Sequence, residues 1–308
     1  MKTLDIVTSA KNESQNLVHL VQAIEKVMEN EPYTWRVIIS ENASKDDTWE
    51  VINSLAEKNP KVVGLRMSRD FGFEGAITAG LSHADADAVV IMASDLQDPP
   101  EYISIFLRMF EQGYDHVYQV VESRPGVSKI RNLNSTLFYL LAEKFSKGLI
   151  QRNSSTFRLI SREVRDNLIQ LEERNRFIRA LVSWLGYNSI GISLPRAPRV
   201  YGKSKANSRH VFSYAMKGIL ANSYSLLDFV GIFGVITSSI SLIATFVFSI
   251  VWIFHGVPFA GFGMLIGSIF LGFGLVFLCL GIIAQYLSLV YEEIKARPNY
   301  VIREIVGG

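Results

Sequence analysis

Short apolar runs alternate with polar loops and amphipathic segments along the first hundred residues. The runs cover residues 4–8, 37–40, 62–67 and 88–92, and each is typical of a buried strand. After the first polar loop, apolar residues recur at helical spacing, with Leu17, Leu20 and Ile24 on one face. Strand–loop–helix units in succession predict an α/β fold with a mostly parallel sheet. Their polar loops would then meet at one edge, where the strands have their carboxyl ends.

The pattern is less regular after residue 110. The expected strands are residues 115–121, 156–160 and 188–194, and the expected helices are residues 127–145, 162–171 and 173–184. A basic loop follows at residues 195–205. Residues 211–227 have the spacing of an amphipathic helix, which favours a position in a membrane interface. Packing of this helix against its own domain is the alternative.

A long stretch near the end of the chain has no charged side chain. No Asp, Glu, Lys or Arg occurs between Asp228 and Glu292, and a membrane-spanning helix needs about 20 apolar residues. We predict two transmembrane helices, at residues 229–254 and 264–290. Lys217 precedes the first and Lys295 follows the second, so the positive-inside rule predicts a multi-pass protein of the inner or plasma membrane with both termini in the cytoplasm.

These segments divide the chain into four expected parts. Residues 1–205 would form a cytoplasmic domain, residues 206–228 a juxtamembrane amphipathic helix, residues 229–291 a two-helix transmembrane hairpin and residues 292–308 a cytoplasmic tail. The net charge is +2, from 31 Lys and Arg against 29 Asp and Glu, so no global basicity indicates a nucleic-acid partner. The single cysteine, Cys279, excludes an internal disulfide framework.

The fourth apolar run ends in the polar sequence SDLQDPP at residues 94–100. In open α/β sheets, ligands bind beyond the carboxyl ends of the strands. The Asp95 carboxylate and the Gln97 amide at that edge suit a magnesium ion that carries a diphosphate, because hard cations take oxygen ligands. The alternative is a loop in which Asp95 or Asp98 caps the next helix. No GxxxxGK[ST] and no GxGxxG after the first strand is present, which disfavours P-loop and generic dinucleotide folds.

The motifs occur in an order that resembles a known family. They are NES, ENASKDDT, SRDFGFEGAITAGL, SDLQDPPE, FRLISREV, ERNRFIRALVSWLGY, RVYGKSK and KARPNY. This series is similar to the polyprenyl-phosphate glycosyltransferases of the GT-A class, in family 2. That family includes the bactoprenol-phosphate glucosyltransferases and, more distantly, dolichol-phosphate mannose synthase. The resemblance extends from about residue 4 to residue 304 and implies a GT-A nucleotide-sugar-binding domain.

The resemblance also implies roles for individual residues. Glu13 and Asn42 correspond to donor-binding positions. Asp95 and Gln97 correspond to catalytic positions that hold Mg²⁺ or Mn²⁺ and the donor diphosphate. The positions that meet phosphates of donor or acceptor are Arg131, Ser135, Arg199 and Lys205. For Arg131, a solvated helix residue or a surface ion pair is the alternative.

This chain departs from the family pattern at several carboxylates. The family usually has Asp-x-Asp where this chain has Ala93-Ser94-Asp95, so one expected carboxylate is missing there. It also usually has an aspartate at the position of Asn42 and another at the position of Thr156. A lipid monophosphate is largely dianionic at pH 7, since its second pKa is near 6 as in phosphorylated side chains. The nucleophile therefore needs no general base. The leaving diphosphate does need its charge stabilised, and Lys11, in place of a customary aromatic, would add positive charge there.

The expected function is inverting transfer of a sugar from a nucleotide-diphosphate sugar, UDP-linked, to a polyprenyl (undecaprenyl) phosphate. Transfer would occur at the cytoplasmic membrane face and give a lipid-linked sugar for cell-envelope glycosylation. Membrane lipids and further copies of the chain, in a homo-oligomer, are the other expected partners. The alternative is a pseudo-transferase that binds nucleotide sugar or lipid phosphate and has lost catalysis with its carboxylates.

Overall fold

The computed structural model describes residues 1–121, 153–197, 225–255 and 262–308. The strands are β1 (Lys2–Ala10), β2 (Tyr33–Glu41), β3 (Val62–Met67), β4 (Ala88–Ala93), β5 (His116–Val121), β6 (Ser154–Ser161), β7 (Ser189–Leu194) and β8 (Ile302–Val306). The helices are α1 (Ser14–Met28), α2 (Thr48–Lys58), α3 (Gly72–His83), α4 (Tyr102–Glu111), α6 (Arg162–Gln170), α7 (Ile178–Trp184), α9 (Ser225–His255) and α10 (Phe262–Lys295). The predicted helix at 127–145 and residues 211–224 of the predicted amphipathic helix lie outside the described residues.

The strands form one sheet in the order β7-β5-β6-β4-β1-β2-β3-β8. β1 pairs in parallel with β2 on one side and with β4 on the other, and β2 pairs in parallel with β3. β6 runs antiparallel to both β4 and β5, and β7 is parallel to β5. The predicted α/β class with a mixed, mostly parallel sheet is therefore confirmed.

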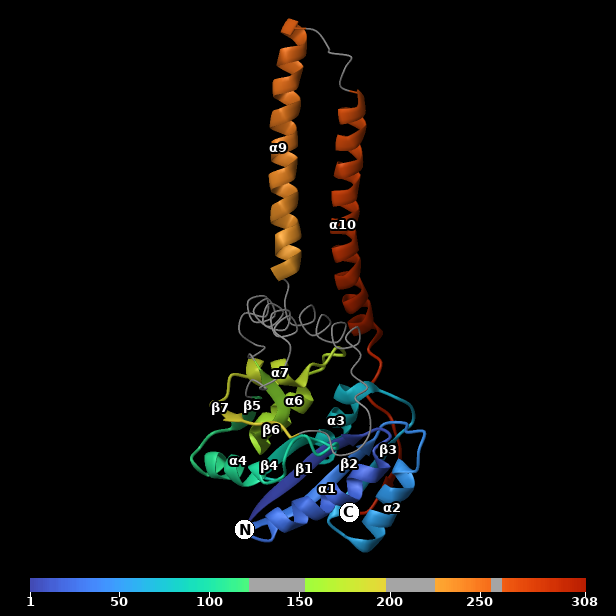
Figure 1. Ribbon diagram of the computed structural model, residues 1–308, viewed down its shortest axis with the longest axis vertical. Helices are drawn as coiled ribbons and strands as arrows, with labels where there is room; N and C mark the ends of the chain where they lie inside the picture. Colours follow the sequence, from blue (N-terminus) through green and yellow to red (C-terminus); the bar gives the residue numbers. More distant parts are fainter. Residues whose placement is uncertain (122–152, 198–224, 256–261) are drawn as a thin grey trace.

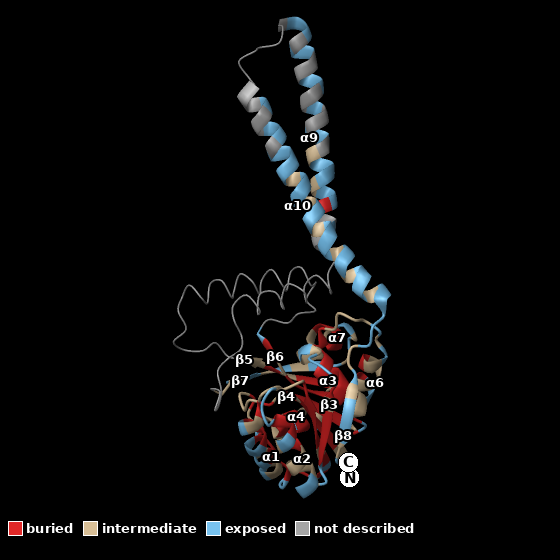
Figure 2. Ribbon diagram, turned by 90° about the vertical axis from the view of Figure 1, so that its right-hand side faces the viewer, coloured by how far each residue is buried: buried red, intermediate tan, exposed pale blue. Residues whose placement is uncertain are grey.

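Helices cover both faces of the sheet, as Figure 1 shows. Successive strand residues point to opposite faces, so Ile6 joins the core under α1, α2 and α4, whereas Val7 joins the core with α3, α6 and α7. Both residues are fully buried. Burial on both faces explains why the central strands are continuous apolar runs without alternation. The red interior of Figure 2 is formed by these strands and the inner helix faces.

Two features of the second half differ from the sequence predictions. The predicted helix at 173–184 is wrong at its start, because α7 begins at Ile178. The carboxylate of Glu293 accepts the backbone N–H groups of Arg174 at 2.9 Å and Asn175 at 3.1 Å, which holds residues 173–177 as a loop. The predicted tail contains a strand, β8, which pairs antiparallel with β3 and places Val306 opposite Gly64.

The long helices α9 and α10 extend together away from the sheet domain (Figures 1 and 2). They occupy the positions of the two predicted spans. Among the described residues, one segment is long and apolar enough to cross a membrane, Leu271–Lys295 in α10, and its apolar part is not buried within the protein. Within the described residues, this apolar C-terminal helix therefore indicates membrane association.

Gly64 tests how closely β8 and α2 pack on β3. A Cβ at this position would overlap Ile52 Cγ2 and lie 2.7 Å from Val306 Cγ2. We expect Gly64→Ala to lower the free energy of unfolding by about 1–3 kcal/mol, because overpacking displaces both neighbours. Denaturant unfolding of the full-length variants measures this loss. Val306→Ala removes one of the two obstructing methyl groups, so the double variant should lose less than the two single losses combined. Strictly additive losses would contradict the packing of β8 at this glycine.

Candidate functional site

A cavity of about 520 Å³, lined mainly by polar and charged residues, opens at the carboxyl ends of the first four strands. Its lining residues are Ser9, Lys11, Glu13, Asn42, Asp70, Gly72, Phe73, Ala93, Ser94 and Asp95. They come from the ends of β1 and β4, from the loops after β1, β2, β3 and β4, and from the start of α3, so the predicted convergence of these loops is observed. β1 lies between β2 and β4 in the sheet, and ligands of open α/β sheets bind where the strand order reverses in this way.

The turn after β4 positions Asp95 in the cavity wall. The hydroxyl of Ser94 donates to the carbonyl of Ser9 at 2.9 Å, which fastens the turn to the end of β1. Leu96 adopts a left-handed conformation with φ 60°, and the Gln97 N–H donates to Asp95 Oδ1 at 3.2 Å. These contacts close a tight turn on the aspartate. The Gln97 side chain is not among the residues that line the cavity.

Asp98 also holds this turn, from the buried side. It is fully buried, its Oδ2 accepts the Ala93 N–H at 3.0 Å, and its Oδ1 lies 3.3 Å from Nε of Arg196. Burial raises the pKa of Asp98, and the Arg196 guanidinium opposes that rise. The alternative in which Asp95 or Asp98 caps the next helix is not observed, because α4 has Glu101 at its N-cap and no side-chain capping bond.

Asn42 is buried and holds the loop between β3 and α3. Its Nδ2 donates to Asp70 Oδ1 at 2.9 Å and to the Gly72 carbonyl at 3.1 Å, while its Oδ1 accepts the Phe71 N–H at 2.9 Å. Asp70 also forms an ion pair with Lys11. Burial raises the pKa of Asp70, but the hydrogen bonds from Lys11 and the Gly72 N–H outweigh it and hold the pKa below its usual value.

Glu13 stands at the start of α1 and is almost fully buried. Its Oε2 accepts Nδ2 of Asn16 at 2.6 Å, and its backbone N–H donates to the hydroxyl of Thr48 at 3.0 Å. These bonds tie the loop after β1 to the start of α2. A carboxylate held in this way presents an acceptor to the hydroxyl or amide groups of a ligand in the cavity.

The structure brings three of the predicted site residues together, since Glu13, Asn42 and Asp95 all line the cavity. Gln97 is adjacent in sequence but not in the lining. The other four predicted positions lie outside the described residues: Arg131, Ser135, Arg199 and Lys205. Asp70 was not predicted as a site residue; its position in the polar loop that follows a buried strand is the signal that identifies it.

The carboxylates of the cavity show whether the residues present suit the expected metal ion. Among the described residues, no group of three or more His, Cys, Asp or Glu side chains forms a metal cage. Asp70 is engaged by Lys11 and Asn42, and Asp95 lies in the cavity wall at the end of β4. Mg²⁺ in particular keeps several waters and binds through one or two carboxylates plus substrate phosphates. This donor set fits such a shared site.

Comparison with known proteins gives a consistent result. The model for glycosyl transferase family 2 matches residues 5–169. An SfII prophage-derived bactoprenol glucosyl transferase of Shigella flexneri is 33% identical over 302 residues, which cover 98% of this chain and 97% of that protein. A prophage bactoprenol glucosyl transferase homolog of Escherichia coli is 30% identical over 303 residues, covering 98% and 99%. Glucosyl-3-phosphoglycerate synthase of Mycobacterium tuberculosis, solved with Mn²⁺ and UDP-glucose, has a TM-score of 0.49 at 18% identity, covering 72% and 78%.

The protein is therefore a glycosyltransferase with an α/β fold. The chain belongs to glycosyltransferase family 2. The family resemblance expected from the motif order is confirmed over nearly the whole length of the chain.

Replacing Asn42 by aspartate tests the structural use of its amide. The aspartate would keep an acceptor for the Phe71 N–H but lose both donations, and it would place a second carboxylate beside Asp70. Two carboxylates this close raise the pKa of one of them. A raised folded-state pKa costs stability above that pKa and relieves the cost as pH falls. We therefore expect the melting temperature of Asn42→Asp to lie further below that of the wild type at pH 8 than at pH 5.

Asn42→Ala is the matched control. It loses both donations and also the acceptor for the Phe71 N–H, at a cost of about 1–3 kcal/mol, but adds no charge. Its deficit in melting temperature should change much less between the two pH values. If both variants showed the same pH dependence, the contact between position 42 and Asp70 would not control the loop.

Proposed function

We propose that the protein transfers a sugar from a UDP-linked donor to a polyprenyl phosphate, with inversion, at the cytoplasmic face of the membrane. Family membership supports the reaction class. The names of the relatives from Shigella flexneri and Escherichia coli support a bactoprenol acceptor and a glucosyl donor. The product is a lipid-linked sugar, the form in which a sugar is available for cell-envelope glycosylation.

The observation that carries this proposal is the short connection between the apolar helix α10 and the strands that border the cavity. α10 ends at Lys295, and the chain returns within a few residues as β8, which pairs with β3. The loop after β3 supplies Asp70 and Gly72 to the cavity wall. A cavity for a water-soluble donor thus lies beside a helix suited to a bilayer. A lipid acceptor and a nucleotide sugar would meet at this place.

Two sets of residues divide the binding in this proposal. Glu13 contacts the nucleoside part of the donor, and Asp95 lies at its diphosphate. Arg131, Ser135, Arg199 and Lys205 seat the phosphates, and these four assignments rest on the family resemblance alone. Asn42 acts indirectly, since its amide holds the loop that carries Asp70.

The transfer is an in-line displacement at the anomeric carbon. A phosphate oxygen of the acceptor forms the new bond on the face opposite the nucleotide, and the bond to the nucleoside diphosphate breaks with its electron pair. The acceptor phosphate is already largely dianionic at pH 7, so no protein base needs to remove a proton. The nucleoside diphosphate leaves with added negative charge, which Lys11 at the cavity wall stabilises.

Asp95 would hold Mg²⁺ or Mn²⁺, with Gln97 as a further oxygen donor if its side chain turns inward. The ion would supply positive charge to the leaving diphosphate. The protein residues would orient the donor around it: Glu13 through its fixed carboxylate, and the Ser94–Ser9 contact through the turn that presents Asp95.

The membrane arrangement in this proposal is a hairpin of α9 and α10. Both helices lie mostly within the long stretch that has no charged side chain, and they run together away from the sheet (Figure 2). Both chain termini lie at the far end of the domain, away from the two helices. That placement supports a cytoplasmic domain with both termini on the cytoplasmic side. The proposed parts remain residues 1–205, 206–228, 229–291 and 292–308, assembled as a homo-oligomer.

Asp95→Ala tests the chemistry. Loss of the carboxylate at the leaving group should lower kcat by about 10²–10³-fold, the range seen when one transition-state contact is removed. The assay incubates purified full-length protein with polyprenyl phosphate and a panel of nucleotide sugars, and weighs the lipid product by mass spectrometry. Asp166→Ala, at an exposed carboxylate of α6, is the control and should retain wild-type turnover. Undiminished glycolipid synthesis by Asp95→Ala would exclude this mechanism.

Chelation tests the metal separately. Excess EDTA should abolish transfer, and added Mg²⁺ or Mn²⁺ should restore it, because the ion is shared between Asp95 and the donor diphosphate. Wild-type activity that persists in the chelator would remove the ion from the mechanism and leave the charge of Lys11 as the principal stabilisation.

A further inference from the structure

A second cavity, which we name the basic cavity, lies where α10 meets the sheet domain. Its volume is about 700 Å³, and it is lined by Arg69, Asp70, Phe71, Arg174, Ser288, Tyr291, Glu292, Lys295, Arg297, Pro298 and Asn299. Asp70 also lines the cavity at the strand ends, which we name the donor cavity, so the two spaces adjoin at this residue. None of the functions assigned above uses the basic cavity.

The charge of this cavity is positive. Four cationic side chains line it, against the carboxylates of Asp70 and Glu292. Asp70 already pairs with Lys11, which lies outside the cavity. Among the described residues, no ion pair joins any of the four cations to a carboxylate. Two of them lie instead over aromatic rings: Arg69 over Phe71 at 4.2 Å and Lys295 over Tyr291 at 5.0 Å.

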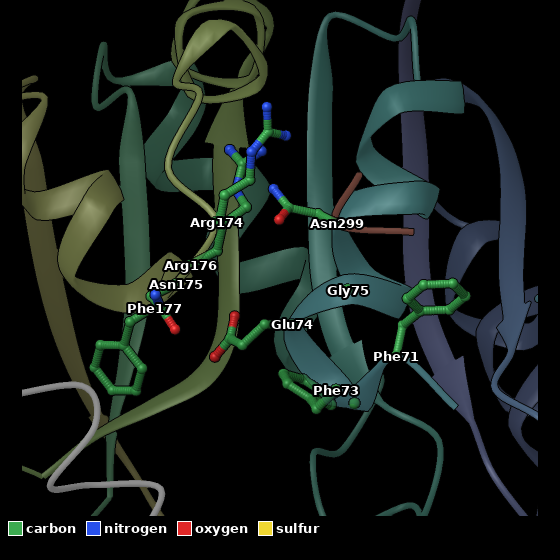
Figure 3. A pocket seen from close by; sticks show the side chains of 10 residues that line it. Phe71, Phe73, Glu74, Gly75, Arg174, Asn175, Arg176, Phe177 and Asn299 are labelled. Carbon is green, nitrogen blue, oxygen red and sulfur yellow. The ribbon is translucent and has the colours of Figure 1, made fainter. Parts of the chain in front are cut away.

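The backbone around the cavity is firmly held. The Glu293 carboxylate binds the N–H groups of Arg174 and Asn175, and Asn299 Nδ2 donates to the Glu173 carbonyl at 3.0 Å. Arg174 and Asn299 therefore have fixed backbones on two sides of the space. Figure 3 shows both side chains at the same end of the adjoining pocket, which has a volume of about 250 Å³. A backbone held in this way loses little further entropy when an anion binds, so the cost that remains is the ordering of the side chains.

The position along α10 defines which anion reaches the cavity. Ser288, Tyr291, Glu292 and Lys295 recur at spacings of three and four, so one face of the last two turns lines the space. The apolar segment that ends at Lys295 would place these turns at the depth of the lipid headgroups. Basic pockets at the cytoplasmic end of membrane helices bind anionic headgroups, and arginine binds phosphate through two parallel hydrogen bonds.

We propose that the basic cavity binds the phosphate headgroup of an anionic bilayer phospholipid. Arg174 and Arg297 contact the phosphate oxygens, and Lys295 lies at the rim. The bound headgroup joins the end of α10 to the loop before α7 and so holds the sheet domain, with its donor cavity, at a defined depth. This inference rests on the membrane placement of α10 in the proposed function, but it requires neither the sugar transfer nor the acceptor.

The test measures stabilisation of the full-length protein in mixed micelles. Dioleoylphosphatidylglycerol should raise the melting temperature of the wild type more than dioleoylphosphatidylcholine does, and inorganic phosphate at the same concentration should not. In Arg174→Gln/Arg297→Gln, the concentration of phosphatidylglycerol needed for half of the effect should rise roughly 10- to 30-fold, since each cation near a membrane surface contributes about fivefold. Lys26→Gln/Lys58→Gln removes the same charge from the ends of α1 and α2 and should behave as the wild type.

Several outcomes would overturn the proposal. They are equal stabilisation by the two phospholipids, equal behaviour of the two double variants, and stabilisation by inorganic phosphate alone. A further one is a rise in KM for polyprenyl phosphate in Arg174→Gln/Arg297→Gln with unchanged response to phosphatidylglycerol, which would assign the cavity to the acceptor. If that double variant fails to fold, the exposed Lys295→Gln serves, with an expected shift of about fivefold. Asp95→Ala should keep the full lipid response while losing transfer, so failure of the transfer mechanism and failure of the lipid site remain distinguishable.

Discussion

The parallel pairing of β1 with β2 on one side and with β4 on the other is the constraint on which the site depends. Helices that follow β1 and β3 leave toward opposite faces, since α1 packs in one core and α3 in the other. The loops at this strand edge therefore separate and leave a crevice instead of a packed surface. Lys11 and Glu13 reach it from β1, and Asp95 reaches it from β4. The chemistry of the cavity is thus a consequence of strand order.

The second constraint is the attachment of the apolar helix to the domain at two points. Glu293 binds the loop that precedes α7, and β8 pairs with β3 a few residues later. Gly75 of α3 permits a close approach of the backbone between α10 and β8, because a Cβ at Gly75 would lie 2.7 Å from the carbonyl of Asn299. An end fixed in this way keeps the cavity at a constant distance from α10. In the proposed function, such an arrangement raises the effective concentration of a membrane-bound acceptor and leaves the chemical step to the residues in the cavity.

The sequence predicted what depends on local pattern and missed what depends on distant contacts. The first four strands and their helices were predicted because each is an apolar run or a helical repeat. β8 was missed, since its ladder joins Gly64 to Val306 across the apolar segment. The start of α7 was misplaced because Glu293, 119 residues from Arg174, determines the loop. Asp95 was predicted as a site residue from its position after a strand and Glu13 from the family resemblance, whereas the contacts of the Asn42 amide with the loop after β3 are visible only in three dimensions.

The contacts in the cavity give a physical reason why Asn42 and Ala93 stand where the family usually has aspartate. A carboxylate at position 42 would meet Asp70, so the amide at this position and the Lys11–Asp70 pair form one compatible set. With Ala93 in place of another acid, the cavity holds less negative charge than a site built on several aspartates. Less negative charge weakens the hold on a cation but also repels an incoming diphosphate less. In the proposed reaction, Lys11 and the ion at Asp95 therefore share the leaving group's charge, and the lipid phosphate, ionised already, requires none of the lost acids as a base.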